Sequence, residues 1–160
     1  FERFGRLDGL VACAAELGPI TPVSHLEPEA LDRIMAVNAF ANHRLIRSLD
    51  PLLRAAPDAR AVFVTDGAAG PGRAYWGGYA ASKAALEALA LAYAAELRIT
   101  RVKVNLLDPG PMATRLRAQA YPGERAGAIP QPRAAAAAAV ELLLPECGRH
   151  GEIIRLAPGR

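Results

Sequence analysis

Short apolar runs alternate along this chain with longer segments in which apolar residues recur at helical spacing. The clearest short run is ARAVFVTD, residues 59–66, which leads into the glycine-rich stretch GAAGPGRAYWGG. A run so short and so apolar predicts a strand that is buried on both faces, as strands of parallel sheets are. Alternation of such strands with helices is typical of βαβ units, so the pattern predicts an α/β fold with a parallel sheet.

The length suits one domain, residues 1–160, and no internal repeat or low-complexity linker divides it. Strands are expected at 7–15, 59–66, 101–110 and 151–159, and helices at 29–53, 77–98 and 133–144. The helix at 77–98 is apolar on almost every side, which predicts burial on every face. One sheet can cover only one of these faces, so we expect a second copy of the chain to cover another, in a homodimer or homotetramer.

The composition is that of an ordinary globular protein and disfavours several kinds of partner. The net charge is only +3 and the arginines are interspersed with acidic residues, so no nucleic-acid partner is expected. No apolar stretch has the length of a membrane span, and the opening FERFGRLDGL lacks the apolar core of a signal peptide. The 2 cysteines and 3 histidines lack disulfide-framework or metal-ligand spacing, which predicts no metal site and a cytoplasmic location.

The stretch GGYAASKAAL places Tyr79 and Lys83 four residues apart at the start of a predicted helix. Residues at this spacing lie on one face of a helix, so the ammonium group can approach the phenol. A neighbouring cation favours the phenolate, which predicts a lowered pKa for Tyr79 and a group suited to acid–base catalysis. The spacing alone is weak, because most such pairs are incidental polar residues on a helix surface.

Several motifs in the expected order make the chain resemble the short-chain dehydrogenase/reductase family. YAASK is similar to the active-site motif of that family, and the resemblance implies that Tyr79 donates and accepts the proton. It also implies that Lys83 lowers the pKa of Tyr79 and binds the nicotinamide ribose. MAVNAF places Asn38 at the family's mid-helix asparagine, which holds a water molecule of the proton relay.

The segment DPGPMAT resembles the family's PGxxxT loop. The resemblance implies that Pro109 and Gly110 approach the nicotinamide and that Thr114 bonds its carboxamide. It therefore implies a Rossmann-like, doubly wound sheet, an NAD(P) cofactor and a small-molecule carbonyl or alcohol substrate. GRAYWGGYAASK and RLRAQAYP are similar to bacterial members of the family, the YciK-like oxidoreductases.

Asp66 departs from the family pattern, which has a serine thirteen residues before the tyrosine to donate a hydrogen bond to the substrate oxygen. An ionised carboxylate has no proton to donate and repels a developing oxyanion, so reduced carbonyl chemistry is expected. Thr65 is the nearest hydroxyl, but adjacent strand residues point to opposite faces. Pairing with Lys83 or capping of the following turn explains Asp66 better than a new catalytic role.

Two further departures concern the cofactor cleft. VACAAELG stands where the family has an asparagine-rich NNAG turn, and Cys13, without an acid–base partner nearby, is expected to be a small buried residue. No strand is followed by a GxxxGxG or GxGxxG phosphate loop. The chain therefore resembles the family from its fourth strand onward and lacks the first βαβαβ half, so its first strand should be an exposed apolar edge. Either a longer gene product supplies the missing half, or a separate segment or second subunit covers this edge, or the fold is adjusted locally.

Two hypotheses about function follow. The first is an NAD(P)-dependent oxidoreductase that transfers hydride between nicotinamide and a carbonyl or alcohol, as the pair of Tyr79 and Lys83 favours. The second is a dehydrogenase-like scaffold that dimerises without turnover, as Asp66 and the missing glycine loop favour.

Overall fold

The four strands form one parallel sheet, as the sequence pattern predicts. A computed structural model describes residues 3–70, 72–125, 127 and 129–156. The sheet has the order β1-β2-β3-β4, and each strand runs parallel to its neighbour. The strands are β1 (Gly9–Ala12), β2 (Arg60–Val64), β3 (Lys103–Asp108) and β4 (Ile153–Arg155).

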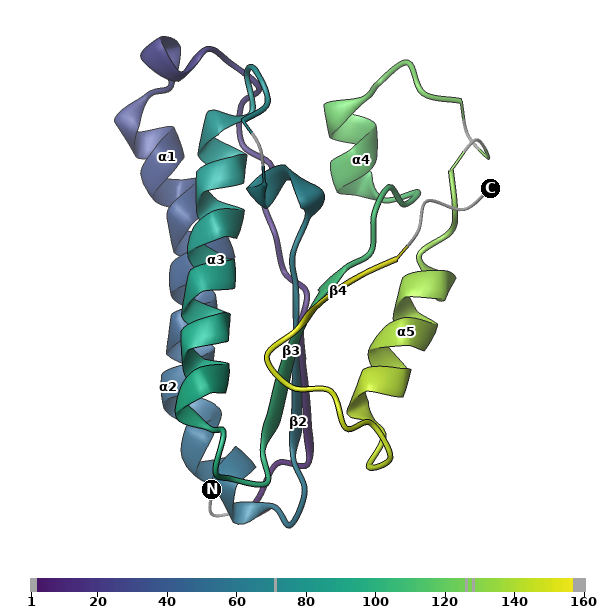
Figure 1. Ribbon diagram of the computed structural model, residues 1–160. Helices are drawn as coiled ribbons and strands as arrows, with labels where there is room; N and C mark the ends of the chain where they lie inside the picture. Colours follow the sequence, from purple (N-terminus) through teal and green to yellow (C-terminus); the bar gives the residue numbers. More distant parts are fainter. Residues whose placement is uncertain (1–2, 71, 126, 128, 157–160) are drawn as a thin grey trace.

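Helices cover both faces of the sheet, which makes it doubly wound. The helical segments are η1 (Val23–His25), α1 (Pro28–Met35), η2 (Ala36–Phe40), α2 (Ala41–Ala55), η3 (Gly67–Ala69), α3 (Gly77–Glu96), α4 (Arg115–Ala120) and α5 (Arg133–Leu143). Figure 1 shows α1, α2 and α3 on one side of the sheet and α4 and α5 on the other. The Rossmann-like α/β fold class is therefore confirmed.

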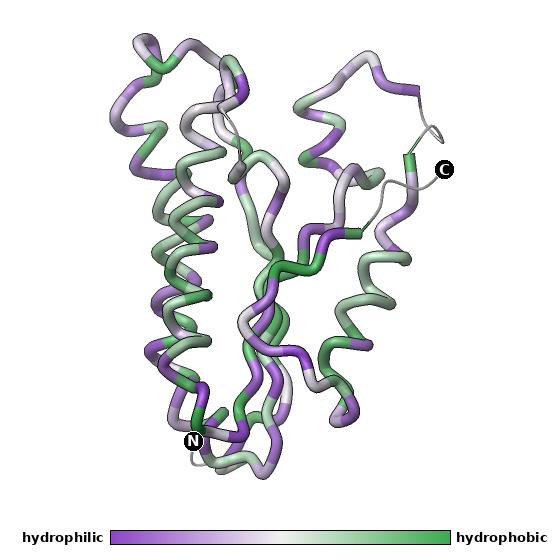
Figure 2. Tube along the Cα trace, viewed as in Figure 1, coloured by the Kyte–Doolittle hydropathy of each residue, from purple (hydrophilic) through white to green (hydrophobic). Residues whose placement is uncertain are grey.

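The two central strands are buried because their side chains alternate between two apolar layers. Phe63 and Leu106 face the cluster formed with α2 and α3, whereas Val62 and Leu107 face the cluster formed with α5. Figure 2 shows the hydrophobic residues along these strands. No helix in the described ranges combines the length and the apolar character needed to cross a membrane.

Several elements differ in detail from those predicted. The strand predicted at 7–15 is limited to Gly9–Ala12, at the edge of the sheet beside β2. The face of α3 away from the sheet is not buried within the chain, because alanines that include Ala84, Ala88 and Ala92 are exposed along it. Helix α4 was not predicted, and its start is fixed by Thr114, whose hydroxyl oxygen accepts a hydrogen bond from the Arg117 amide at 3.2 Å.

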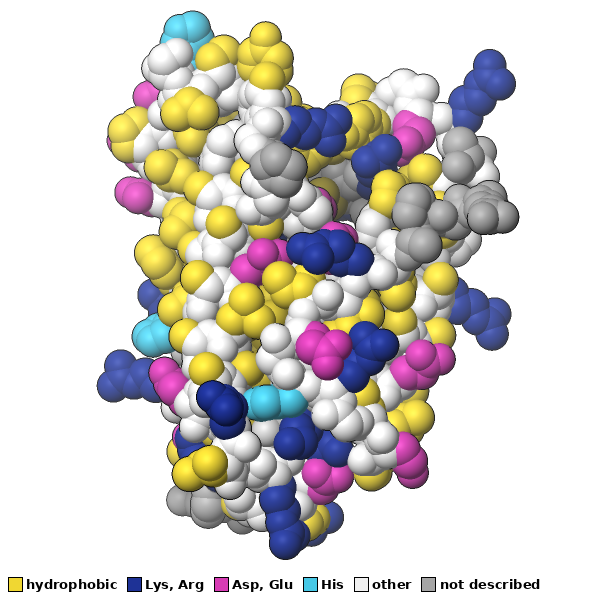
Figure 3. All heavy atoms as spheres, in the orientation of Figure 1, with side chains coloured by type: hydrophobic (Ala, Val, Ile, Leu, Met, Phe, Trp, Pro, Cys, Tyr) yellow, Lys and Arg dark blue, Asp and Glu magenta, His cyan; other side chains and the backbone are white. Residues whose placement is uncertain are grey.

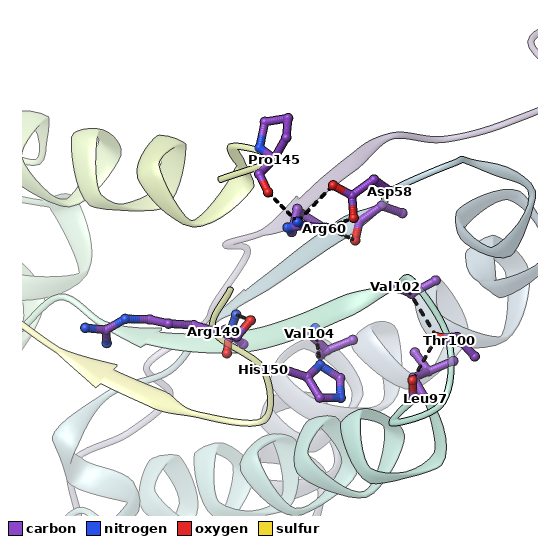
Figure 4. Close-up of polar contacts among 11 residues, drawn as sticks. Asp58, Arg60, Leu97, Thr100, Val102, Val104, Pro145, Arg149 and His150 are labelled. Carbon is purple, nitrogen blue, oxygen red and sulfur yellow. Dashed lines mark hydrogen bonds and ion pairs between the residues drawn. The ribbon is translucent and has the colours of Figure 1, made fainter. Parts of the chain in front are cut away.

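Side chains tie the sheet to its surroundings at the end where β2 and β3 begin (Figure 4). The buried Arg60 guanidinium donates to Asp58 at 3.0 Å and to the Pro145 carbonyl at 2.9 Å. His150 Nδ1 accepts a hydrogen bond from the Val104 amide at 3.1 Å. These bonds join the loops after α5 to the central strands. They lie at the end of the sheet opposite to the cavity described next.

Candidate active site

A cavity of about 760 Å³ lies at the carboxyl ends of β2 and β3. Its walls come from the segment after β1, the loop from β2 to α3, the first turns of α3, the segment from β3 into α4, and the end of β4. In the space-filling view a hollow opens between the side of α3 and the side of α4 (Figure 3). This is where open α/β sheets bind ligands, because the loops that follow the strands diverge there.

Tyr79 and Lys83 lie on the first two turns of α3 and both face this cavity. Only 5% of Tyr79 and 2% of Lys83 is exposed, so α3 buries both polar groups against the sheet. Lys83 Nζ donates a hydrogen bond to the Val64 carbonyl at 3.0 Å and lies 5.8 Å from the centroid of the Tyr79 ring. The predicted pair is therefore brought together, with one of the three ammonium hydrogens bonded to β2.

Asp66, directly beyond β2, accepts two hydrogen bonds at the floor of the cavity. Its Oδ1 accepts from the Ala68 amide at 2.8 Å, and its Oδ2 accepts from the Tyr79 hydroxyl at 3.2 Å. The predicted cap of the following turn is thus confirmed, but pairing with Lys83 is wrong, since no ion pair joins these two described residues. Thr65 cannot replace the missing serine as it stands, because its hydroxyl donates to Glu87 at 2.7 Å.

The pKa of Tyr79 is raised well above its ordinary value near 10, and the expectation that Lys83 lowers it is wrong for this arrangement. Burial is the largest cause, followed by the charge of Asp66, the hydrogen bond to Asp66 and the charge of Asp108. Burial also lowers the pKa of Lys83, and the charge of Asp66 opposes this effect. Burial and the two carboxylates thus act in the same direction, and all of them favour the protonated phenol.

Substituting Tyr79→Phe should leave the rise in absorbance at 295 nm between about pH 8 and pH 11 unchanged, because Tyr79 keeps its proton over this range. The phenol of Tyr79 ionises near pH 10 in the unfolded chain but stays protonated in the folded chain. Its contribution to the free energy of unfolding is therefore complete below pH 10 and is lost as the pH rises further. A spectrophotometric titration of both proteins, 4 tyrosines against 3, checks this expectation. A smaller rise in absorbance at 295 nm below pH 11 in Tyr79→Phe than in the native protein would contradict this expectation.

The segment 109–114 after β3 also lines the cavity, and it includes Pro109, Gly110 and Thr114. Gly110 has a φ of 65°, which a side chain would strain, and its amide donates to Asp108 at 3.0 Å. Because the Thr114 oxygen accepts from a helix amide, its hydroxyl hydrogen is left for an acceptor in the cavity. Asp108 was not among the predicted site residues, although its place at the carboxyl end of a buried strand was the available signal.

Asn38 does not line the cavity but holds the segment beside it in place. It lies in the π-helical turn η2, and its amide group donates to the Glu16 carbonyl and to Ser82, both at 2.8 Å. Its Oδ1 accepts from the Glu16 amide at 2.8 Å. Both amide hydrogens and one lone pair of Oδ1 are used in these bonds. The second lone pair of Oδ1 therefore remains to accept a hydrogen bond from a water molecule.

Cys13 corrects another expectation, since it is exposed and lines the cavity instead of being buried. The aromatic rings at the cavity mouth were also not predicted. The Trp76 ring lies 5.9 Å from the ring of Tyr79 and 5.9 Å from that of Tyr121. Within the described ranges, no three His, Cys, Asp or Glu side chains are placed to hold a metal ion.

The residues at the cavity fit the nicotinamide half of a dinucleotide. Lys83 has two ammonium hydrogens beyond the one given to Val64, which suits the hydroxyl groups of a ribose. Gly110 places backbone without a side chain at the cavity wall, and the Thr114 hydroxyl suits a carboxamide oxygen. The cavity volume also lies in the range of small-molecule sites.

Comparison with known proteins identifies one family. The family model described as short chain dehydrogenase matches residues 1–125. The uncharacterized oxidoreductase YciK of Escherichia coli K12 is 38% identical over 122 residues, which are 76% of this chain and 48% of YciK. The (S)-benzoin-forming benzil reductase IRC24 of Saccharomyces cerevisiae is 32% identical over 121 residues, 72% of this chain and 46% of the reductase.

The fold comparison agrees with the sequence comparison. A short chain dehydrogenase from Escherichia coli CFT073, solved in complex with NADPH, superposes on this chain with a TM-score of 0.90 at 32% identity. The superposition covers 96% of this chain and 64% of the dehydrogenase. The chain spans about half the length of the curated relatives it matches. The predicted resemblance, including the one to YciK-like proteins, is confirmed.

Proposed function

Because this chain belongs to the short-chain dehydrogenase/reductase family, we propose that it forms the reaction site of an NAD(P)-dependent oxidoreductase. The reaction is hydride transfer between the nicotinamide and a carbonyl or alcohol carbon of a small molecule. The observation that carries the proposal is the convergence of Tyr79, Lys83 and the segment 109–114 on one cavity. Two similar proteins, a benzil reductase and a short chain dehydrogenase solved in complex with NADPH, support the same chemistry.

Tyr79 is the proposed acid–base group. In carbonyl reduction its hydroxyl gives a proton to the substrate oxygen, and in alcohol oxidation the tyrosinate takes that proton back. The phenol is protonated at neutral pH, as the reductive direction requires, but its raised pKa makes it a weaker proton donor than an ordinary tyrosine. A bound nicotinamide supplies or accepts the hydride.

Lys83, Pro109, Gly110 and Thr114 are the proposed cofactor-binding residues, together with the Tyr79 hydroxyl. Asn38 is the proposed relay residue, through the second lone pair of Oδ1.

Asp66 is expected to slow this reaction. Its Oδ2 accepts a hydrogen bond from the Tyr79 hydroxyl, with 3.2 Å between the two oxygens, so a substrate oxygen must displace a carboxylate before it can accept the proton. A carboxylate beside the substrate oxygen also opposes the negative charge that develops there during reduction. We therefore expect slow turnover of simple carbonyl compounds by the native sequence.

Titration of the chain with NADH and NADPH tests the proposal, using energy transfer from Trp76, the only tryptophan. Saturable transfer is expected, and Lys83→Met should weaken it about tenfold because two hydrogen bonds to the ribose are lost. Arg98→Gln is the matched control, since it also removes one positive charge but lies exposed at the far end of α3. Equal affinity in all three proteins would contradict the role of Lys83, and no transfer with folded protein would contradict the proposed function.

The alternative, a scaffold that dimerises without turnover, predicts assembly without oxidation of NADPH in the presence of a carbonyl compound, so a turnover assay on the titrated sample separates the two. In either case we propose a homodimer or homotetramer built on α2 and α3. Phe40 and Leu45 are 49% and 37% exposed, and the alanines of α3 leave a second apolar face uncovered within the chain. Sedimentation equilibrium of the titrated sample gives the mass, and a single-chain mass would contradict this assembly.

A further inference from the structure

Two arginines and two aromatic rings form a connected array at the mouth of the cavity. The Arg73 guanidinium lies 4.6 Å from the centroid of Trp76 and 5.5 Å from that of Tyr121. Arg117 lies 3.7 Å from the same Tyr121 ring, and Glu124 fixes it through two hydrogen bonds of 2.7 Å. The array joins the loop before α3 to helix α4, so it determines what can enter between them.

Arg73 differs from the other arginines of the cavity in its partners. Arg117 pairs with Glu124, and the Arg155 Nε lies 3.8 Å from the Asp108 carboxylate. No carboxylate in the described ranges lies at ion-pair distance from Arg73, which is exposed at the mouth. Aromatic rings engage a guanidinium without using its N–H groups, so Arg73 keeps a pre-positioned donor edge for an anion.

The inner end of the cavity has the opposite character. Asp66 accepts the hydrogen bond of Tyr79, and the charge of Asp108 also acts on that phenol. A carboxylate directly next to the reacting carbonyl would meet two like charges here, whereas a carboxylate at the mouth would meet Arg73. Trp76 connects the two ends, since its ring centroid lies 4.6 Å from the Arg73 guanidinium and 5.9 Å from the centroid of Tyr79.

We propose that the substrate is an aromatic or similarly flat carbonyl compound, or the matching alcohol, with a carboxylate at the end remote from the reacting carbon. Arg73 binds the carboxylate through two N–H groups, and Trp76 and Tyr121 contact the flat body. Tyr79 then meets the carbonyl oxygen. The inference rests on the proposed function for the identity of the reacting group, but the binding preference does not require turnover.

Three small probes test this preference in direct binding, by calorimetry or ligand-observed NMR on the intact chain. They are 4-formylbenzoate, its neutral methyl ester, and phenylglyoxylate, which carries its carboxylate next to the ketone. We expect 4-formylbenzoate to bind about tenfold tighter than either of the others, because it alone places the charge at Arg73 and away from Asp66. Arg73→Gln should abolish the preference over the ester, and Arg98→Gln, the same change in net charge at a distant exposed site, should retain it.

Ester binding as tight as that of the carboxylate, or a preference that survives in Arg73→Gln, would overturn the inference. The inference would also be overturned if Arg73→Gln bound NADPH more weakly but still discriminated between the probes, because Arg73 would then serve the cofactor. If the preference depends on Arg73 but no aldehyde is reduced in the presence of NADPH, the proposed reaction falls and the proposed ligand class stands.

Discussion

Substituting Asp66→Ser is expected to raise kcat/KM for aldehyde reduction by about 10²–10³-fold, the usual effect of one donor aimed at a developing oxyanion. The change removes a carboxylate that holds the Tyr79 hydroxyl at 3.2 Å and supplies a hydroxyl that can donate to the substrate oxygen. Serine also caps helical turns well, so the bond from the Ala68 amide, now 2.8 Å, can be kept. The rate of NADPH oxidation with 4-formylbenzoate and its methyl ester measures the effect.

Asp66→Ala separates the two causes, since alanine removes the charge but donates nothing. We expect kcat/KM of Asp66→Ala to lie between the values of the native sequence and Asp66→Ser, and its affinity for NADPH to be close to that of Asp66→Ser. A fall in activity in both variants would mean that Asp66 is itself a required acid or base, and the account of it as an obstacle would be wrong.

Substituting Asn38→Ala is expected to lower the free energy of unfolding by about 3 kcal/mol. The change leaves the Glu16 amide, the Glu16 carbonyl and the Ser82 hydroxyl without the partner that each has at 2.8 Å. Asn38 itself is fully buried, so water cannot replace these bonds without opening the packing between η2 and α3. Urea unfolding monitored by circular dichroism gives the change, provided that the slope with denaturant stays constant.

Asn42→Ala is the control for Asn38, because it removes a single side-chain bond, to the Asn38 carbonyl at 2.8 Å. A loss of about 1 kcal/mol is expected there. Asn38→Ala should also weaken binding of 4-formylbenzoate, since Glu16 directly follows Ala15, which lines the cavity. Equal losses of stability in the two variants would contradict the role of Asn38 as the main connection between this segment and α3.

Local pattern was enough to predict most of the framework. The burial of β2 followed from a run of apolar residues in ARAVFVTD, and the start of α3 followed from the spacing in YAASK, because both depend on residues that are neighbours along the chain. The ends of β1 were less predictable, since a strand ends where its partner's hydrogen bonds end, here after the pairing of Ala12 with Phe63.

The sequence by itself determined the parallel α/β fold, the family and the presence of Tyr79 and Lys83 on one face of a helix. Only the tertiary structure decided how these groups behave, because the pKa of Tyr79 depends on its burial and on carboxylates that β2 and β3 bring to it. The same holds for Arg73, whose contact with Tyr121 joins segments far apart in the chain. Spacing along the backbone fixes which side chains share a face, whereas charge and desolvation depend on distances that only the packed fold sets.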